Sequence, residues 1–555
     1  MASTDEPDLR LTRQRLWALL TPDGAYLRVF MVYGVAISLL GLGLPIAVQT
    51  LINTTANIGS TRAIVILALA LLLLLGLAAM LSAMRMWATE LYARRVYARI
   101  SAAISLRVVL APHSFFEGRR NAGLTHRYFD IMTLQKNIPH LIGDGFTVLL
   151  QTFVGMTLVS FYHLWFWLFN LLVLAILLLG WWFWDRDARV AAIKLSKKKY
   201  NSARWLGNLE AAHEFFKTSA HLDFAGRKTE EHISQFIEMH RQFFHSTFMQ
   251  ALVFLGVYAL GSAALLGLGG WLVVLGELSI GQLVAAELIM SSVFFSLPRF
   301  VSFLRSYYEL YGVADKIGEI LSIPQEDTEP GIASGESIRN GISCKNVVLE
   351  RDGQRCTVSF DLEPGEDLVI HASADWMQRQ LTSVLRCYSK PSQGWIKLGG
   401  YALEDYHSYE LRHRVTTIDR SLIDECTIEE FMLLAAPDAS LAQVIEALQR
   451  VQLYDRIQSL PDGLDTQLSQ LGAPLMPLEL VRLKVAAVLL AKPPLVIINQ
   501  NFDGVPDAMR TLLLNLLAEE SFNMIYFSQL PMPPQFDVEM TLTVDADSNQ
   551  QEAAS

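Results

Sequence analysis

The apolar positions of the chain form long, nearly uninterrupted runs before about residue 310 and short, alternating runs after it. A run of about 20 apolar residues is long enough to cross a bilayer as a helix. Six such spans are predicted, at residues 28–52, 63–87, 140–160, 163–184, 247–272 and 280–303. Only 18% of the residues are charged, which fits a membrane protein better than a large soluble one.

The connections between these spans alternate in length, and basic residues concentrate in the long ones. More than fifty residues separate span two from span three and span four from span five, whereas the other connections are short. The basic residues that flank the spans include Arg10, Arg13, Arg15, Arg94, Arg95, Arg99, Arg186, Arg189, Lys197, Lys198 and Lys199. Because such residues favour the cytosolic side, we expect the N-terminus, both long connections and the C-terminal domain in the cytosol.

Both long connections have the pattern of continuous helices. Residues 90–109 and 203–245 place apolar side chains three and four positions apart. At ~1.5 Å per residue, these helices predict arms of roughly 35–40 Å that extend away from the bilayer. Each arm needs a turn at its tip, which we expect at residues 117–123 and 208–218.

The composition changes after about residue 322. Residues 322–340 are rich in Pro, Gly and acidic residues and predict a linker, and residues 341–545 alternate short strands with helices. We expect an α/β domain with mixed sheets there, after a membrane domain at 28–321. A charged helical leader at 1–27 argues against a cleavable signal peptide, and residues 546–555 are expected to be disordered.

Charge and cysteine content exclude two classes of function. The net charge of −10 gives no electrostatic support for nucleic-acid binding. All four cysteines lie in the C-terminal part, at Cys344, Cys356, Cys387 and Cys426, and their spacing offers no pair of metal ligands. We interpret them as reduced thiols in the core of a cytosolic domain.

Residues 369–384, with the sequence VIHASADWMQRQLTSV, predict a strand, a short loop and then an amphipathic helix over LTSVLRCY. A nucleotide-binding α/β domain places its phosphate-binding loop, GxxxxGK followed by Ser or Thr, at such a position. Here Ala372, Asp375 and Met377 stand where that loop needs glycines, and Gln378 replaces the lysine. The pattern therefore predicts the strand, loop and helix that hold a phosphate-binding loop, without the glycines and the lysine that bind phosphate.

The order of these parts resembles the half-transporters of the ABC exporter family, type I fold. In the membrane part, HSFFEGRRNAG and LVVLGELSIGQLVA resemble family segments at the first arm's tip and between spans five and six. In the C-terminal part, LEPGEDLVI, ELRHRV, TIEEF, LPDGLDTQL and LLAKPPLVII resemble the nucleotide-binding domain. The resemblance covers residues 10–545 and implies a half-transporter that works as a dimer.

The resemblance also shows where the chain departs from the family's catalytic pattern. The aromatic residue that stacks on adenine corresponds to Arg351, and the hydroxyl that binds magnesium corresponds to Arg379. The glutamine-loop position is Arg420, and the switch histidine is Ser528. A guanidinium can reach a phosphate but cannot replace a metal ligand.

The two remaining motifs depart as well. The signature LSGGQ becomes LMPLE, in which Met476 has no hydroxyl, Pro477 has no N–H and Leu478 adds bulk. The Asp-Glu pair that should hold magnesium and activate water becomes Asn499–Gln500, two amides without charge or basicity. Because the family joins the phosphate loop of one subunit to the signature of the other, an intact partner could complete neither site.

We therefore expect no catalytic residues, no metal, and no ATP or magnesium at this chain's own site. The first hypothesis is a non-hydrolysing subunit of a heteromeric export complex, possibly for peptide or protein secretion, energised by other ATPase subunits. The alternative is a non-transporting scaffold or regulator that binds a complete exporter or an envelope complex. Expected partners are another half-transporter chain, a larger export complex and the lipid bilayer of a bacterial-type inner membrane.

Two carboxylates in the spans are the candidates for a transport pathway. Asp144 lies at the start of span three and Glu287 lies in span six. A carboxylate is costly to bury in a membrane, which favours a function, but both also have the position of interfacial, solvated residues. Two glutamines, Gln151 and Gln250, are expected to bridge helices. The identity of any cargo does not follow from these residues.

Overall fold

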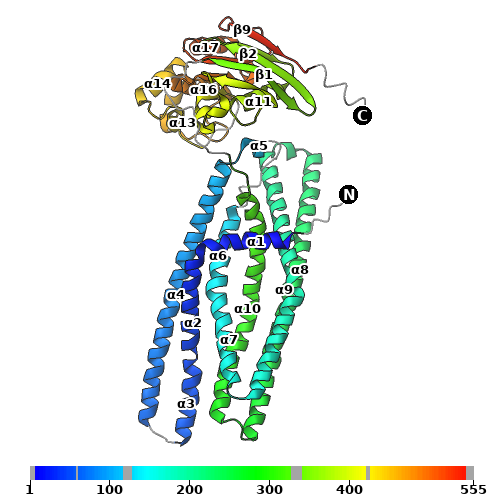
Figure 1. Ribbon diagram of the computed structural model, residues 1–555, viewed down its shortest axis with the longest axis vertical. Helices are drawn as coiled ribbons and strands as arrows, with labels where there is room; N and C mark the ends of the chain where they lie inside the picture. Colours follow the sequence, from blue (N-terminus) through cyan, green and yellow to red (C-terminus); the bar gives the residue numbers. More distant parts are fainter. Residues whose placement is uncertain (1–6, 58–60, 117–127, 327–340, 420–424, 546–555) are drawn as a thin grey trace. The chain divides into compact units, whose positions relative to one another are not determined.

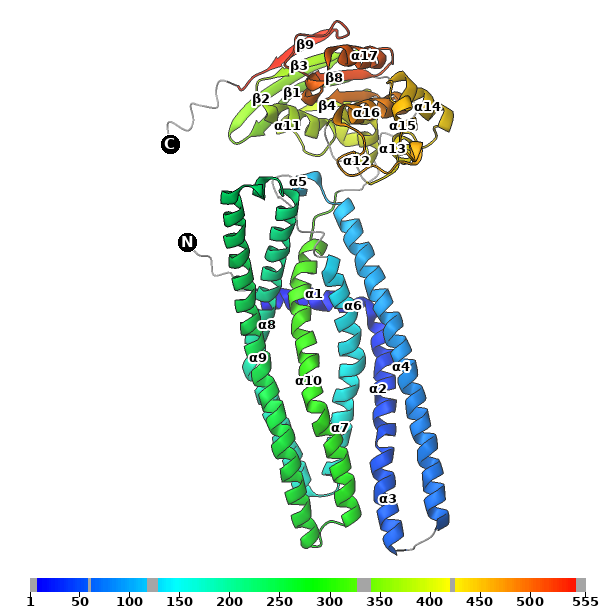
Figure 2. The same cartoon turned by 180° about the vertical axis from the view of Figure 1, so that it is seen from behind.

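The computed structural model describes residues 7–57, 61–116, 128–326, 341–419 and 425–545. Its contacts divide the chain into two compact units. The first unit comprises Met1–Ala111 and Gly118–Gln325, and the second comprises Pro112–Glu117 and Glu326–Ser555. The first unit is helical and the second combines helices with sheets, as Figures 1 and 2 show from opposite sides. The predicted fold class, a six-span membrane domain followed by an α/β domain, is confirmed.

The first unit is built almost entirely from long helices. They are α1 (Leu9–Leu20), η1 (Thr21–Asp23), α2 (Gly24–Gly41), α3 (Gly43–Asn57), α4 (Thr61–Val109), α6 (Tyr128–Pro139), η3 (His140–Gly145), α7 (Phe146–Ser160), α8 (Leu164–Ala211), η4 (Phe215–Lys217), α9 (Ser219–Val274) and α10 (Ile280–Leu321). Six helical segments among the described residues are long and apolar enough to cross a membrane, as the sequence predicts.

Two spans are less regular than the sequence pattern suggests. The first predicted span contains a break at Leu42, between α2 and α3. The third begins with η3, a single π-helical turn that joins α6 to α7. Such turns leave a backbone carbonyl without its usual helical partner, and they are frequent at functional sites. Hydrophobicity alone cannot reveal either feature, because neither changes the apolar pattern.

The second arm has the geometry that the sequence predicts. Helix α8 continues for 27 residues beyond the predicted span end, from 184 to Ala211, and α9 returns from Ser219. The two helices run side by side over their length (Figure 1), and η4 forms the turn at the tip. The tip of the first arm, predicted at residues 117–123, lies outside the described residues.

Glycines let the membrane helices approach closely. A Cβ atom at Gly261 of α9 would lie 2.8 Å from Phe294 of α10, and one at Gly269 would lie 2.4 Å from Leu283. Gln250 of α9 is fully buried and donates to the Tyr308 hydroxyl at 2.8 Å, so it bridges α9 and α10 as predicted. Small residues and such bridges are the usual means of helix association in membranes.

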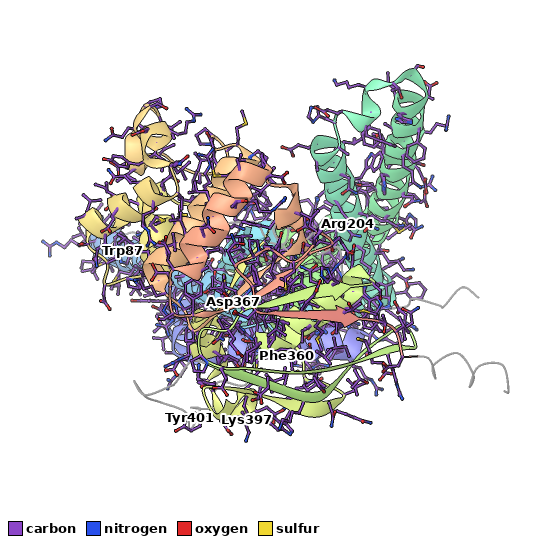
Figure 3. All side chains as sticks on the ribbon, turned by 90° about the horizontal axis from the view of Figure 1, so that it is seen from above. Trp87, Arg204, Phe360, Asp367, Lys397 and Tyr401 are labelled. Atoms are coloured by element: carbon purple, nitrogen blue, oxygen red, sulfur yellow. The ribbon has the colours of Figure 1, made fainter. Side chains whose placement is uncertain are left out.

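The second unit contains two sheets. The strands are β1 (Ile342–Arg351), β2 (Gln354–Leu362), β3 (Leu368–Ala372), β4 (Gln393–Leu398), β5 (Tyr401–Ala402), β6 (Val415–Ile418), β7 (Leu495–Ile498), β8 (Asn523–Phe527) and β9 (Val538–Leu542). One sheet is antiparallel with the order β2-β1-β4-β5, and the other is parallel with the order β6-β7-β8-β3-β9. Lys397 and Tyr401, on β4 and β5, mark the free edge of the first sheet in Figure 3.

Helices surround these sheets and bury two apolar cores. The helices are α5 (His113–Phe116), α11 (Asp375–Leu385), η5 (Leu403–Asp405), α12 (Ser408–Arg414), α13 (Ile428–Ala435), α14 (Leu441–Arg450), α15 (Tyr454–Gln458), η6 (Gly463–Asp465), α16 (Pro477–Ala491), η7 (Gln500–Gly504) and α17 (Asp507–Ala518). Cys344, Cys356 and Cys426 are buried and form no disulfide within the described residues, as expected, and burial raises the pKa of Cys356 to about 11.

Several elements differ from the sequence prediction. The predicted helix over LTSVLRCY actually begins six residues earlier, at Asp375, and ends at Leu385. Its buried residues Met377, Leu381 and Val384 lie four and three positions apart, so one continuous apolar face includes the predicted loop. Strand β9 was not predicted, since its alternating burial gives a short and weak signal.

A compact polar cluster joins Glu326, in the predicted linker, to α12, to α5 and to Tyr388, which follows α11. Arg412 forms a bidentate ion pair with Glu326, at 2.7 and 2.9 Å, and its guanidinium lies 4.4 Å from the ring centroid of Tyr388. The ring of Tyr388 also stacks on the imidazole ring of His113 of α5, and the two ring centroids lie 4.3 Å apart. We call these four residues the Arg412 cluster.

Candidate functional site

The parallel sheet brings three of the predicted positions to one edge. Strands β7, β8 and β3 are neighbours and run in the same direction, so their carboxyl ends meet. Ala372 is the last residue of β3, Ser528 follows β8 and Asn499 follows β7. In open α/β sheets, ligands bind at this edge. These three positions therefore lie at one edge of the parallel sheet, and their role in a site stays a prediction.

The first turn of α11 contains the phosphate-loop positions. Met377 is fully buried in an apolar core, and Gln378 is only 5% exposed. The side-chain nitrogen of Gln378 is buried without a hydrogen-bond partner among the residues that the structure describes. Asp375 and Arg379 are exposed, and their charged groups lie 3.9 Å apart. The position that a lysine would hold thus bears a buried amide, and the exposed cation is accompanied by a carboxylate.

The amide after β7 has a local structural role. The side-chain oxygen of Asn499 accepts a hydrogen bond from the N–H of Asn501 at 2.9 Å, which caps η7. Gln500 is the first residue of η7 and is half-buried. No group of three His, Cys, Asp or Glu residues that could hold a metal ion occurs within the described part of the chain. Asn499 itself is an acceptor that is already used by the backbone.

A carboxylate that the sequence reasoning missed organises the centre of this edge. Asp503, in η7, accepts hydrogen bonds from the Tyr526 hydroxyl, from the Ser528 hydroxyl at 2.8 Å and from the N–H of Gln529 at 2.9 Å. The side chain of Gln529 in turn donates to the Ala372 carbonyl at 2.7 Å. We call these five residues the Asp503 network. The sequence feature that could have identified this group is Asp503 itself, a carboxylate four residues after Asn499 in a turn sequence.

The network also explains the position of Ser528. Ser528 is 1% exposed, its hydroxyl donates to Asp503, and its carbonyl oxygen lies 2.7 Å from a ring nitrogen of His371. The other ring nitrogen of His371 lies 2.7 Å from Glu539 of β9. Both nitrogens of this histidine are therefore engaged by residues that belong to β9 or follow β8, which fixes the orientation of its ring.

The signature positions lie at the N-terminus of α16. Met476 precedes this helix and is 65% exposed, and its N–H donates to Glu479 at 2.9 Å. Pro477 begins the helix, and Leu478 packs against the larger core. Pro477 and Leu478 line a pocket of about 450 Å³ together with Asp419 and Asn501, and no lysine or arginine is among its described lining residues. Such a lining does not favour an anion.

Two further predicted positions lie apart from this edge or outside the described residues. Arg351 is the last residue of β1 in the antiparallel sheet, and its guanidinium lies 3.6 Å from the carboxylate of Asp352. Arg420 falls outside the described residues. The loss of nucleotide chemistry at all these positions stays a prediction, because geometry describes the side chains but does not measure binding.

The pathway candidates differ in their surroundings. Asp144 lies in η3 and forms an ion pair with Arg85 of α4 at 3.0 Å. Arg85 also donates to the Gly143 carbonyl at 3.0 Å, which supplies a partner for the π-helical turn. Glu287 accepts from Ser291 at 2.7 Å, and its second oxygen is buried without a partner among the described residues. Neither arrangement tests a contact with cargo.

Asp367, labelled in Figure 3, is a buried carboxylate at the start of β3. Burial raises its pKa to about 7, the Met524 N–H opposes the shift through a 2.6 Å hydrogen bond, and Asp537 adds to it. The folded state therefore holds this proton more tightly than the unfolded state, and its stability falls as the pH rises from about 4 to about 7.

We expect Asp367→Asn to stabilise the second unit at pH 8 and to have little effect at pH 4. The neutral amide keeps an acceptor for the Met524 N–H and carries no buried charge. Thermal unfolding of the full-length chain at several pH values measures this difference. Asp361→Asn on β2 is an exposed control, and an Asp367→Asn effect that is equal at all pH values would contradict the assignment.

Comparisons with known proteins agree with this architecture. The chain is 25% identical over 238 residues to a putative multidrug export ATP-binding/permease protein, YgaD, of Bacillus subtilis, covering 42% of this chain and 41% of the relative. It is 28% identical over 212 residues to a probable ABC transporter ATP-binding/permease protein of Haemophilus influenzae, covering 37% and 38%. No protein-family model matches the sequence.

A longer match extends over most of the chain. The ABC multidrug transporter mdr2 of Aspergillus fumigatus is 22% identical over 442 residues, which is 76% of this chain and 54% of the relative. The chain thus spans about half or less of the length of these relatives. Fold and comparisons together identify it as a protein of the ABC exporter type, in which a six-span membrane domain precedes an ABC ATPase-like domain. It is an integral, multi-pass inner-membrane protein.

Proposed function

We propose that this chain is a non-hydrolysing subunit of a heteromeric export complex whose ATP hydrolysis takes place in other chains. The observation that carries the proposal is the buried amide of Gln378 at the phosphate-loop position. A phosphate-binding lysine must present a cation to the β and γ phosphates, and a neutral, buried side chain cannot do so. The cytosolic domain then serves for folding and docking.

The surroundings of the other positions support the same proposal. The Asp503 network fills the strand edge with donors and acceptors that already satisfy one another. At the signature, an exposed Met476 and a pocket lined without lysine or arginine among the described residues disfavour a γ-phosphate. Magnesium and ATP are accordingly not expected to bind with useful affinity at this chain's own site.

The membrane part supports a subunit that takes part in transport. All six spans are present, and the second arm is complete from α8 through η4 to α9. At its tip, Phe215 is 58% exposed and is followed by Phe216 and Lys217. An exposed aromatic side chain beside a cation is a suitable contact for another subunit. Relatives are described as multidrug and leukotoxin exporters, but the cargo class of this chain is left open.

The test begins with a complex isolated from native membranes in mild detergent, with its subunits identified. We expect an ABC ATPase chain in the complex, no measurable ATPase activity for this chain alone, and no recovery of activity in Gln378→Lys. Phe215→Ala should lower the ATPase or export rate of the complex about fivefold or more, a common size for coupling between sites. Ile233→Ala, an exposed residue on the shaft of the same arm, is the matched control.

Other results would favour the alternatives. Magnesium-dependent ATP binding by the purified chain at low micromolar concentration would contradict the absence of a nucleotide site. If export proceeds normally without the chain, and if Phe215→Ala has no more effect than Ile233→Ala, the subunit proposal fails. Co-purification with an independently active homodimeric exporter under those conditions would instead identify a scaffold or regulator.

A further inference from the structure

The antiparallel sheet of the second unit has an edge that is only partly paired (Figure 3). Strand β5 has two residues and pairs only with Lys397 and Leu398 of β4. The rest of β4, residues 393–396, borders no further strand in the described part of the chain, and all of it except Ile396 is exposed. An edge of this kind is a template for an additional strand, because its outward backbone groups lack ladder partners.

Two lysines and a tryptophan form a cationic patch on one face of this edge. The ammonium nitrogens of Lys345, on β1, and Lys397, on β4, lie 5.6 and 4.9 Å from the ring centroid of Trp395. Trp395 itself is 40% exposed. Cation–π contacts of this length hold both ammonium groups against one ring. We call these three residues the Trp395 patch, and the positions of its charges are set before any partner arrives.

A β-bulge in β1 shapes the backbone beneath this patch. The pairing of β1 with β4 shifts in register between Lys345 and Val348, and Asn346 has a positive φ of 49°. On β4, Gly394 has a φ of +83°, and a Cβ atom there would lie 2.2 Å from the Asn346 carbonyl oxygen. Bulges re-aim side chains, and Lys345 is here in register with Trp395. The patch therefore depends on a specific backbone geometry as well as on side-chain type.

The Trp395 patch has no counter-charge among the residues that the structure describes. Neither Lys345 nor Lys397 forms an ion pair with a described carboxylate. Asp361 is separated from Lys397 by Ser343 in the sheet register, and it accepts a hydrogen bond from the Ser343 hydroxyl. Two ammonium groups held against one ring repel each other, and carboxylates placed beside them would relieve the repulsion. This positive patch also contrasts with the net charge of the chain, which is −10.

We propose that this edge binds an extended acidic segment of a partner protein, which adds as a strand beside β4. In this mode of binding, main-chain hydrogen bonds supply affinity and alternate side chains supply specificity. Residues two apart in a strand share a face and lie roughly 7 Å apart, so carboxylates at alternate positions can reach Lys345 and Lys397 together. The surface belongs to the antiparallel sheet, and its binding does not depend on whether nucleotide is hydrolysed.

The experiment measures the binding of fluorescent peptides of about ten residues to the purified full-length chain. The probes are an alternating Glu-Val peptide, an alternating Lys-Val peptide and an alternating Glu-Pro peptide. The Glu-Pro peptide keeps the acidic charge, but proline prevents it from forming a strand ladder. We expect the Glu-Val peptide to bind at least about tenfold more tightly than either of the others, because it alone offers both charge and ladder. It should also slow amide hydrogen exchange in β4.

A charge reversal distinguishes recognition from a folding defect. The double variant Lys345→Glu with Lys397→Glu should bind the Glu-Val peptide about tenfold more weakly and the Lys-Val peptide more tightly than the parent chain does. A misfolded sheet cannot produce such a gain. Arg355→Glu, on the exposed surface of β2 in the same sheet, is the matched control and should leave both affinities unchanged.

Three results would overturn the proposal. Absence of Glu-Val binding at about 1 mM peptide would show that the lysines only protect an edge strand from pairing. Equal binding of the Glu-Pro peptide would show attraction of charge without strand addition. Equal affinity of the Glu-Val peptide for the parent chain and for the Lys345→Glu, Lys397→Glu variant would show that the Trp395 patch does not recognise it.

Discussion

Replacing Arg412 by alanine is expected to lower the free energy of unfolding of the second unit by about 3–5 kcal/mol. The Arg412 and Glu326 side chains are only 13% and 11% exposed, and they face each other at 2.7 Å. Removal of the cation leaves the carboxylate of Glu326 buried without its partner, and it also removes the contact with the Tyr388 ring. Thermal unfolding of the purified full-length chain, which should shift by roughly 10 °C, measures this loss.

An exposed ion pair in the same unit provides the control for Arg412→Ala. Lys390 and Glu404 lie 3.6 Å apart, but their side chains are 84% and 68% exposed. Solvent screens such a pair, so Lys390→Ala should change stability by less than about 1 kcal/mol. The double variant Arg412→Met with Glu326→Leu should recover much of the loss, because it leaves no unpaired charge. Equal effects of Arg412→Ala and Lys390→Ala would contradict the importance of burial.

The second large effect is expected for Asp503→Ala, at about 3 kcal/mol or more. The substitution removes the acceptor of three hydrogen bonds and leaves the buried hydroxyls of Tyr526 and Ser528 without it. Burial and the nearby carboxylate both raise the pKa of Tyr526, so this hydroxyl stays a donor at every pH of interest. Thermal unfolding of the full-length chain and proteolysis of the loop after β8 are the measurements.

Two variants distinguish the role of the Asp503 network from that of surface charge. Asp507→Ala removes a nearby carboxylate whose side chain is 90% exposed. It should lower the free energy of unfolding by less than about 0.5 kcal/mol. Asp503→Asn keeps one acceptor and should be intermediate between the parent chain and Asp503→Ala. If Asp503→Ala is as stable as Asp507→Ala, the strand edge is not held by this carboxylate.

Under the proposed function, the second unit must keep its fold without bound nucleotide. The Arg412 cluster stabilises the fold through a buried ion pair, and the Asp503 network does so through hydrogen bonds. Neither requires a nucleotide. A domain stabilised in this way can keep its docking surfaces after its phosphate chemistry is lost. Nucleotide binding normally stabilises a domain by mass action, so a chain without it needs its own internal contacts.

Much of the fold follows from the order of residues along the chain. Spans such as 63–87 exceed the length of any ordinary buried helix, and the strands around Val369 and Ile497 read as short apolar runs bounded by turns. The start of α11 could not be placed in this way, because Met377 counts as part of a loop until its burial against the core is known. The same limit applies at the candidate site. The apolar strands that form its edge were predicted from the local pattern, but the role of Asp503 was not, because it depends on tertiary contacts.

By itself, the sequence determined the six spans, the second arm and the α/β class of the C-terminal domain, whereas the replacement of each expected catalytic residue type stays a prediction. Those properties depend on local hydrophobicity and on residue identity, which no folding step changes. Only the tertiary structure decided that Gln378 is buried, that Asp503 gathers its three donors, and that Lys345 and Lys397 lie against the ring of Trp395. Each of these depends on contacts between residues that are distant in sequence, and a one-dimensional pattern carries no record of which distant side chains meet.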